Sequence, residues 1–237
     1  METGKTAKYF KYAIGEILLV VIGILIALQI NNWNEQRKAN TFQKKILKEI
    51  KTSMEQDLGR TNAILSYRSK IKEQGISDLI ENLQTNYPVA DSVFRKNFYR
   101  AGITLSFYFD KGPFESLKSK GFDYIKNDSV RSKIIRFYEV SLPLGVIFVD
   151  YNKDINSLRR KRLRDSLTNH VYKKQDSSWR IQRTLNLNNI KKSNYLQQLL
   201  DLEQTASDNY KDRLNSIIGN YQEMILLIEN ELERLHK

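Results

Sequence analysis

The chain has 237 residues, a formal charge of +12 and no cysteine, which excludes disulfide bonds, thiol nucleophiles and zinc sites built from cysteine. Its 10 glycines and 3 prolines are too few for the regularly spaced turns of a β-sandwich or β-barrel. The composition therefore predicts a basic, all-α protein.

The first predicted element is an apolar helix near the N-terminus. Residues 12–30 contain one charged side chain, Glu16, and the aromatic residues Tyr9, Tyr12 and Trp33 flank the run. A helix rises about 32 Å from residue 12 to residue 33, close to the ~30 Å core of a bilayer, and aromatic rings favour its two interfaces. We therefore predict a transmembrane anchor with these three aromatic residues as interface belts.

A cleaved signal peptide and a buried core helix are the alternatives for this run. The run ends in the letters ALQINN, without the small residues that a signal peptidase requires, and core helices usually have shorter apolar runs. An uncleaved signal anchor explains the run best, and no later run is long enough to cross again. The anchor divides the chain into a cytoplasmic stub and span over 1–34 and a helical domain over 35–237.

Flanking charge leaves two orientations open. Lysines precede the anchor, and basic residues from Arg37 to Lys48 follow it, so the loop-charge rule alone places the domain in the cytoplasm. A long domain, however, crosses a membrane largely regardless of its charge. Because a short basic N-terminus before an apolar run is the usual export signal, we expect the domain on the outer side of the membrane.

Two blocks of sequence resemble an uncharacterised membrane-protein family, a domain of unknown function common in Bacteroidota. They are KYFKYAIGEILLVVIGILIALQINNWNE at residues 8–35 and PFESLKSKGFDYIKNDSVRSKIIRFYE at residues 113–139. The resemblance implies a protein anchored in the inner membrane of a Gram-negative bacterium, whose outward-facing domain would then be periplasmic. It implies no activity.

One face of the anchor carries polar and small residues. Glu16, Val20, Gly23, Ala27 and Asn34 fall at helical spacing on this face, and small residues four apart let two helices approach closely. The stripe predicts self-association or pairing with another membrane span. The alternative is that Glu16 reaches the interface or pairs with a nearby lysine, while the small residues only fill the span.

The domain is predicted to begin with a membrane-proximal helix over 35–73, because apolar residues recur there at helical spacing until Gly75. Central helices are expected over 76–169, separated by an aromatic-rich loop over 102–112. The residues that should bound or bend these helices are Asp91, Pro113, Gly121, Asn127 or Asp128, and Pro143. Residues 170–192 are polar and basic and are predicted to form a long loop.

The C-terminal segment over 193–237 is predicted to form a long, coiled-coil-like helix. Its core positions follow a 4-3 spacing and comprise Tyr210, Leu214, Ile217, Tyr221, Met224, Ile228, Glu231 and Leu235. We expect this helix to pack antiparallel against the membrane-proximal helix and to close an elongated bundle. A homo-oligomeric coiled coil is the alternative.

The sequence contains no phosphate-binding loop, metal-binding motif or nucleophile motif, and its two histidines, His170 and His236, are far apart. We therefore expect no catalytic residues, no metal and no cofactor. A membrane-tethered hydrolase with an unrecognised site is the weakest alternative.

The densest charge is a basic run whose members are Arg159, Arg160, Lys161, Arg162 and Arg164. Such a run is either a solvated helix end or a surface that binds anionic lipid or an acidic partner. Nucleic acid would require a cytoplasmic domain, and the turn over 121–127 is too long for a helix-turn-helix motif, so nucleic acid is not expected.

These observations predict a single-pass, non-enzymatic scaffold, binding or sensor-like subunit of a bacterial envelope complex. Its expected partners are a second copy of the chain or another envelope protein. The alternative is a cytoplasm-facing, membrane-tethered basic domain that binds nucleic acid or anionic lipid.

Overall fold

The computed structural model describes residues 3–85, 90–150, 155–186, 189–190 and 193–236, with side chains described from Gly15 onward. In these parts of the chain the regular secondary structure is helical except for one two-stranded sheet, which confirms the all-α prediction in its main features. The helices are α1 (Thr3–Ala63), α2 (Ser69–Thr85), α3 (Asp91–Ala101), α4 (Gly112–Lys120), α5 (Asp128–Arg136), α6 (Leu142–Val149), α7 (Ser157–Ser166) and α9 (Tyr195–His236).

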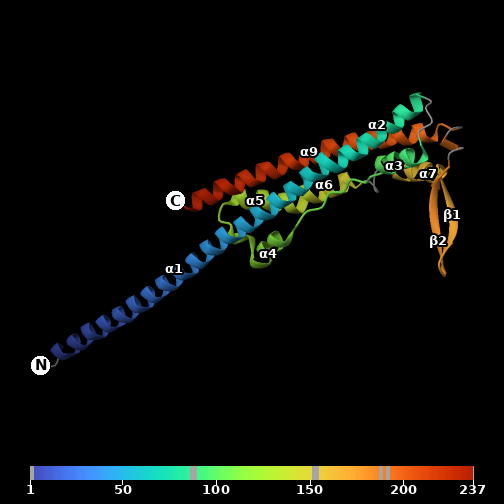
Figure 1. Ribbon diagram of the computed structural model, residues 1–237. Coiled ribbons are helices and arrows are strands. Elements are labelled where there is room, and N and C mark those ends of the chain that lie inside the picture. Colours follow the sequence, from blue (N-terminus) through green and yellow to red (C-terminus); the bar gives the residue numbers. More distant parts are fainter. Residues whose placement is uncertain (1–2, 86–89, 151–154, 187–188, 191–192, 237) are drawn as a thin grey trace.

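The long axis of the molecule is a rod made of α1 and α2 (Figure 1). A π-helical turn over Ile64–Arg68 joins the two helices without a break. The predicted end of this helix at Gly75 is therefore wrong. Gly75 is buried where α3 crosses the rod, and a Cβ there would lie 2.5 Å from the Cβ of Arg100 and 2.6 Å from the backbone nitrogen of Ala101. The glycine allows this close crossing and does not stop the helix.

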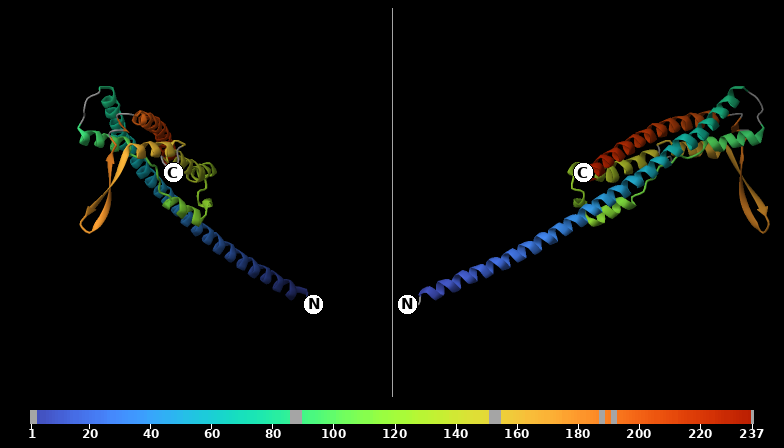
Figure 2. Two further views of the ribbon diagram at one scale, coloured as in Figure 1. Left: turned by 90° about the vertical axis from the view of Figure 1, so that its right-hand side faces the viewer. Right: turned by 60° about the vertical axis from the view of Figure 1, so that its left-hand side comes forward.

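Helix α9 runs antiparallel to the rod, as predicted (Figures 1 and 2). Lys51 pairs with Glu229 at 2.7 Å near the start of the domain, and Lys72 pairs with Glu203 at 2.5 Å near its other end. The predicted heptad is confirmed in its burial at seven of its eight positions, which are Tyr210, Leu214, Ile217, Tyr221, Met224, Ile228 and Glu231. The last position, Leu235, is half-buried against the same core.

Helices α4, α5 and α6 complete the main core against α1 and α9. Aromatic rings fill its centre: Phe114 stacks on Tyr138 with 4.6 Å between centroids, and Phe137 meets Tyr221 edge-on at 5.2 Å. Two predicted helix signals are confirmed. Gly121 ends α4 with a φ of +112°, which only glycine adopts readily, and the Asn127 side chain accepts hydrogen bonds from the first backbone amides of α5. The predicted loop between α3 and α4 also lacks regular structure.

The helix expected to continue from Asp128 towards residue 169 is interrupted. A π-helical turn over Phe137–Ser141 precedes Pro143, where the missing amide hydrogen rules out a regular ladder. Helix α6 then ends at Val149, and Asp150 is extended. Residues 151–154 lie outside the described part of the chain, and α7 begins beyond them.

A β-hairpin replaces most of the predicted loop over 170–192. Strands β1 (Thr168–Gln175) and β2 (Ser178–Leu185) pair antiparallel, and Asp176 has a φ of 55° in the two-residue turn between them. Only the second strand alternates, with Trp179 and Ile181 on either side of Arg180, while Val171 and Tyr172 are adjacent in the first strand, so the polar composition concealed the strand pattern. The hairpin projects sideways from the end of the rod that lies far from the N-terminus (Figure 2).

Candidate functional sites: the apolar helix and the basic distal end

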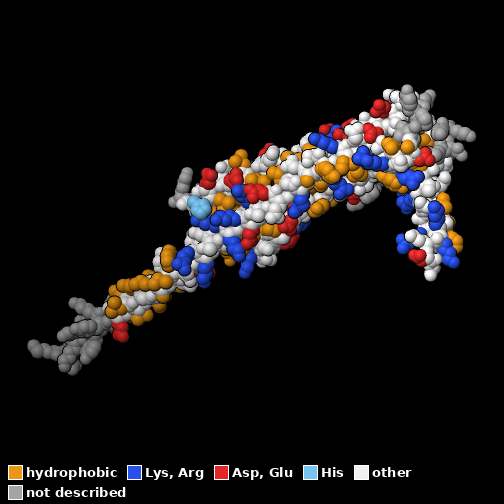
Figure 3. Space-filling view, viewed as in Figure 1, with side chains coloured by type: hydrophobic (Ala, Val, Ile, Leu, Met, Phe, Trp, Pro, Cys, Tyr) orange, Lys and Arg blue, Asp and Glu red, His pale blue; other side chains and the backbone are white. Residues whose placement is uncertain are grey.

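The exposed part of α1 is the first candidate site. Residues 16–33 are exposed throughout, whereas burial against the domain begins at Gln43. Apolar side chains cover this part of the rod in Figure 3. By length and composition, the helix that contains it is able to cross a membrane.

The predicted contact stripe lies on this exposed segment. Glu16, Val20, Gly23 and Ala27 are exposed and Asn34 is half-buried, and a Cβ added at Gly23 would meet nothing within 4 Å. This face is therefore open to another helix.

Only one of the three predicted interface residues has a described side chain. Trp33 is exposed, and the Arg37 guanidinium lies 5.5 Å from its ring centroid. Tyr9 and Tyr12 belong to α1, but their side chains lie outside the described part of the structure.

The second candidate site is a pocket of about 450 Å³ at the distal end, where α3, α7 and the hairpin meet. Its lining includes Arg160, Lys161, Arg164 and Arg183 together with Phe98 and Tyr99. The predicted basic run thus contributes three side chains to one concave surface, and the hairpin adds a fourth cation. Arg159 and Arg162 are exposed on α7.

Arg160 corrects the prediction that the whole basic run lies on the surface. Its side chain is 1% exposed, because Arg160, Leu163 and Leu167 share the inward side of α7 at helical spacing. Arg164 is half-buried and donates two hydrogen bonds to Glu203, at 3.2 and 2.6 Å. Its guanidinium also lies 5.4 Å from the ring centroid of Phe98, so this cation is held in place.

A buried ion pair lies beneath this pocket. The side chains of Lys72 and Glu203 are both fully buried, and the Lys72 ammonium donates to Glu203 at 2.5 Å and to the carbonyl of Ala101 at 2.7 Å. Burial lowers the pKa of Lys72, and the Glu203 carboxylate opposes that shift. Together with Arg164, the pair ties α2, α3, α7 and α9 together.

This ion pair was not predicted from the sequence. A signal was present, because Glu203 continues the heptad of the C-terminal helix upstream and so occupies a core position. The matching cation, Lys72, lies 131 residues away and has no such marker.

The hairpin presents two different faces because side chains alternate along each strand. One face, the aromatic–basic face, comprises His170, Tyr172, Lys174, Trp179, Ile181 and Arg183, with Tyr172 opposite Ile181 and Lys174 opposite Trp179. The other face comprises Asn169, Val171, Lys173, Gln175, Ser178, Arg180, Gln182 and Thr184. Trp179 is 69% exposed and Tyr172 is 66% exposed, so both aromatic side chains of this face are accessible to solvent. Arg183 belongs to both the aromatic–basic face and the pocket.

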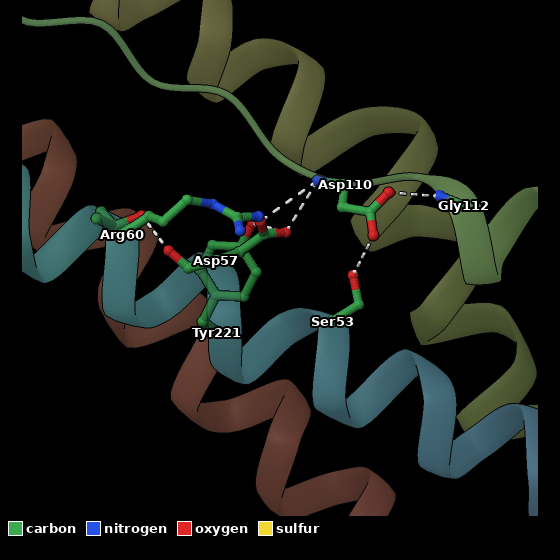
Figure 4. Close-up of polar contacts among 7 residues, drawn as sticks. Ser53, Asp57, Arg60, Asp110, Gly112 and Tyr221 are labelled. Atoms are coloured by element: carbon green, nitrogen blue, oxygen red, sulfur yellow. Dashed lines mark hydrogen bonds and ion pairs between the residues drawn. The ribbon is translucent and has the colours of Figure 1, made fainter.

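A separate polar cluster, formed around Asp57, is buried in the middle of the domain (Figure 4). The fully buried Asp57 carboxylate accepts hydrogen bonds from the hydroxyl of Tyr221 at 3.2 Å and the backbone nitrogen of Asp110 at 3.1 Å, and it pairs with Arg60. Burial raises the pKa of Asp57, although these partners oppose the shift. The Asp110 carboxylate in turn accepts from Ser53 at 3.1 Å. The cluster joins α1 and α9 to the start of α4 and acts as a structural clamp.

Within the described residues, no group of three or more His, Asp or Glu side chains is placed to hold a metal ion. The features that remain are an exposed apolar helix and a basic, aromatic distal end. They define a class of helical rod with a candidate membrane anchor at one end and a candidate binding surface at the other.

Residues 16–158 match the model of a family of unknown function, DUF6090. The match covers more than half of the chain, and the protein belongs to this family. It begins in the apolar helix and ends at Leu158, just before the basic run and the hairpin. The chain has no match among curated proteins or solved structures.

Proposed function

We propose that the protein is a single-pass, non-enzymatic scaffold or binding subunit of a bacterial envelope complex. Its apolar helix anchors it in the inner membrane, and its domain extends into the periplasm. The observation that carries this proposal is the abrupt change along α1: residues 16–33 are exposed and apolar, while Ile46, Leu47 and Ile50 are fully buried in the domain. A helix with these two parts explains both a membrane anchor and a folded domain outside the membrane.

The continuous rod holds the basic end away from the anchor. From Asn34 to Lys72 the helix rises about 57 Å, so the pocket and hairpin would lie far from the bilayer along the rod axis. This arrangement suits a protein that presents a binding surface at a distance from the membrane.

A pair of reporter fusions tests the proposed topology. Alkaline phosphatase, which is active only in the periplasm, is fused after Lys237, and a fluorescent protein that matures only in the cytoplasm is fused at the same position as a control. We expect an active phosphatase and a dark fluorescent fusion. A stable but inactive phosphatase together with a bright fluorescent fusion would refute the periplasmic domain and favour the cytoplasm-facing alternative.

A further inference from the structure

The geometry points to a docking site for an extended acidic segment of another polypeptide on the aromatic–basic face of the hairpin, continuing into the adjoining pocket. This inference deepens the proposed function, since it names the kind of partner that the distal end binds. It rests on that proposal only for its location in the envelope, because the surface itself is defined by the hairpin and α7.

The hairpin is built as an exposed surface and not as part of the core. Every residue from Asn169 to Arg183 is exposed, including Trp179 and Ile181 on the aromatic–basic face. Exposed apolar side chains that gather on one face of an element mark an interaction site more often than isolated ones do. Large aromatic residues are also the side chains that contribute most to binding at protein interfaces.

Charge selects the partner. Of the hairpin cations, Lys174 and Arg183 lie on the aromatic–basic face, whereas Lys173 and Arg180 lie on the opposite face. Asp176 in the turn is the acidic residue of this segment. A second copy of the same face would be repelled, because like charges that face each other disfavour association. Because side chains alternate along an extended segment, a partner faces this surface with every second residue. An acidic segment that carries apolar and acidic residues at these facing positions, with neutral polar residues between them, would place its apolar side chains against Trp179 and Ile181. Its carboxylates would then lie against Lys174 and Arg183.

The free strand edges favour a polypeptide over nucleic acid. The sheet has two strands, so each strand has one paired edge and one outer edge with backbone groups available for hydrogen bonding. An extended peptide can add to such an edge as a further strand, with its side chains spaced to match the face. Nucleic acid has no comparable way to pair with a strand edge.

The pocket extends the same surface. Arg183 lies on the aromatic–basic face and also lines the pocket beside Lys161 and Tyr99. Each strand spans about 26 Å, so a partner segment of roughly eight residues would follow the hairpin from its turn to the pocket. The pocket has a volume of about 450 Å³, and its lining contains four cations and one carboxylate, Asp165, so it remains net basic and suits one acidic side chain at the end of that segment.

The test uses the full-length protein in nanodiscs of neutral phosphatidylcholine. The probe is a fluorescein-labelled peptide of about eight residues whose odd positions are in turn glutamate and isoleucine or phenylalanine, and whose even positions are serine or threonine, so that both kinds of side chain lie on one face. Binding is followed by fluorescence anisotropy with empty nanodiscs as the blank. We expect saturable, salt-sensitive binding. Trp179→Ala should weaken it about ten-fold, as expected for a central aromatic contact.

Two neighbouring lysines supply a matched pair of variants. Lys174→Glu and Lys173→Glu change the net charge by the same amount, but Lys174 lies on the aromatic–basic face and Lys173 on the opposite one. Lys174→Glu should weaken binding about ten-fold and Lys173→Glu no more than about two-fold. Since these side chains are exposed, both variants should retain the far-ultraviolet circular dichroism of the wild type.

Several results would overturn the inference: no binding of the peptide, equal losses for the two lysine variants, or undiminished binding by Trp179→Ala. Tighter binding of a single-stranded oligothymidylate or of phosphatidylglycerol vesicles by the same face would also overturn it. A peptide with alternate N-methylated amides should bind about ten-fold more weakly, and equal affinity would refute pairing with a strand edge. Because the assay does not depend on membrane orientation, failure here with an active phosphatase fusion leaves the proposed anchor and topology intact.

Discussion

Replacing Glu203 by glutamine removes the carboxylate that neutralises two cations at the distal end. Lys72 is fully buried and depends on Glu203 at 2.5 Å, whereas the Arg164 side chain is 23% exposed and can turn towards water. The main cost therefore comes from leaving the Lys72 ammonium buried without its counter-charge. Removing one partner of a buried ion pair typically costs about 3–5 kcal/mol, so Glu203→Gln should lower the free energy of unfolding by about that amount.

The pH dependence of this loss has a definite sign. Burial lowers the pKa of Lys72 in the folded protein below its ordinary value of 10.5. The folded state therefore favours the neutral amine, and the corresponding stability is present above pH 10.5 and is lost as the pH falls through the folded pKa. Because Glu203→Gln removes the group that opposes this shift, the difference in stability between variant and wild type should shrink as the pH rises towards 10.5.

The measurement is urea unfolding of the full-length protein, followed by circular dichroism at several pH values. Lys72→Met serves as the companion variant, because it removes the buried ammonium and leaves Glu203 paired with Arg164. The double variant Lys72→Met/Glu203→Gln should lose less stability than the sum of the two single variants. A cost below about 1 kcal/mol for Glu203→Gln, or strict additivity in the double variant, would refute the reasoning.

Three further predictions follow from the rod and the core. Gly75→Ala should lower the free energy of unfolding by about 1–3 kcal/mol, because the new Cβ would collide with α3. Gly59→Ala should raise it by up to about 1 kcal/mol, because a Cβ there meets nothing within 4 Å. Equal melting temperatures for the two variants would contradict this prediction. Because burial raises the pKa of Asp57, the wild type should gain stability relative to Asp57→Asn as the pH falls towards 3.8. A difference in urea midpoints between the two proteins that does not change with pH would contradict this prediction. Gly23→Ile should reduce cross-linking between membrane-embedded copies of the protein, whereas the control Leu25→Ala, on the opposite side of the helix, should not. Unchanged cross-linking in both variants would show that Gly23 only fills the span.

Local sequence signals predicted the helices well because they depend on residues close together in the chain. The heptad of α9 and its antiparallel partner, the glycine stop at Gly121 and the cap at Asn127 are all confirmed. The distal end was predicted less well because long-range contacts decide it. Gly75 is explained only by the crossing of α3, and the inward direction of Arg160 only by the packing of α7.

At the basic distal end, too, local features were predicted from the sequence and long-range contacts were not. The basic run was found from composition, but its convergence with Phe98 and Tyr99 into one pocket depends on segments about 60 residues apart. The hairpin left only a partial alternation in the sequence, at Trp179 and Ile181 in its second strand. In that segment Tyr172, Trp179 and Ile181 are separated by charged and polar residues, a pattern that also occurs in polar loops.

The π-helical turn between α1 and α2 changes the phase of the rod. Buried positions recur every seven residues at Leu47, Met54 and Thr61, but they resume at Ser69 and Ile76, one residue later than a regular helix would place them. The turn absorbs that extra residue through a hydrogen bond from the amide of Ser69 across five residues. Deleting one residue within the turn would therefore preserve the contacts on both sides, whereas an insertion elsewhere in the rod would rotate the distal half by about 100° relative to the proximal half. The π-helical turn thus keeps the buried faces of the proximal and distal halves of the rod aligned despite the extra residue.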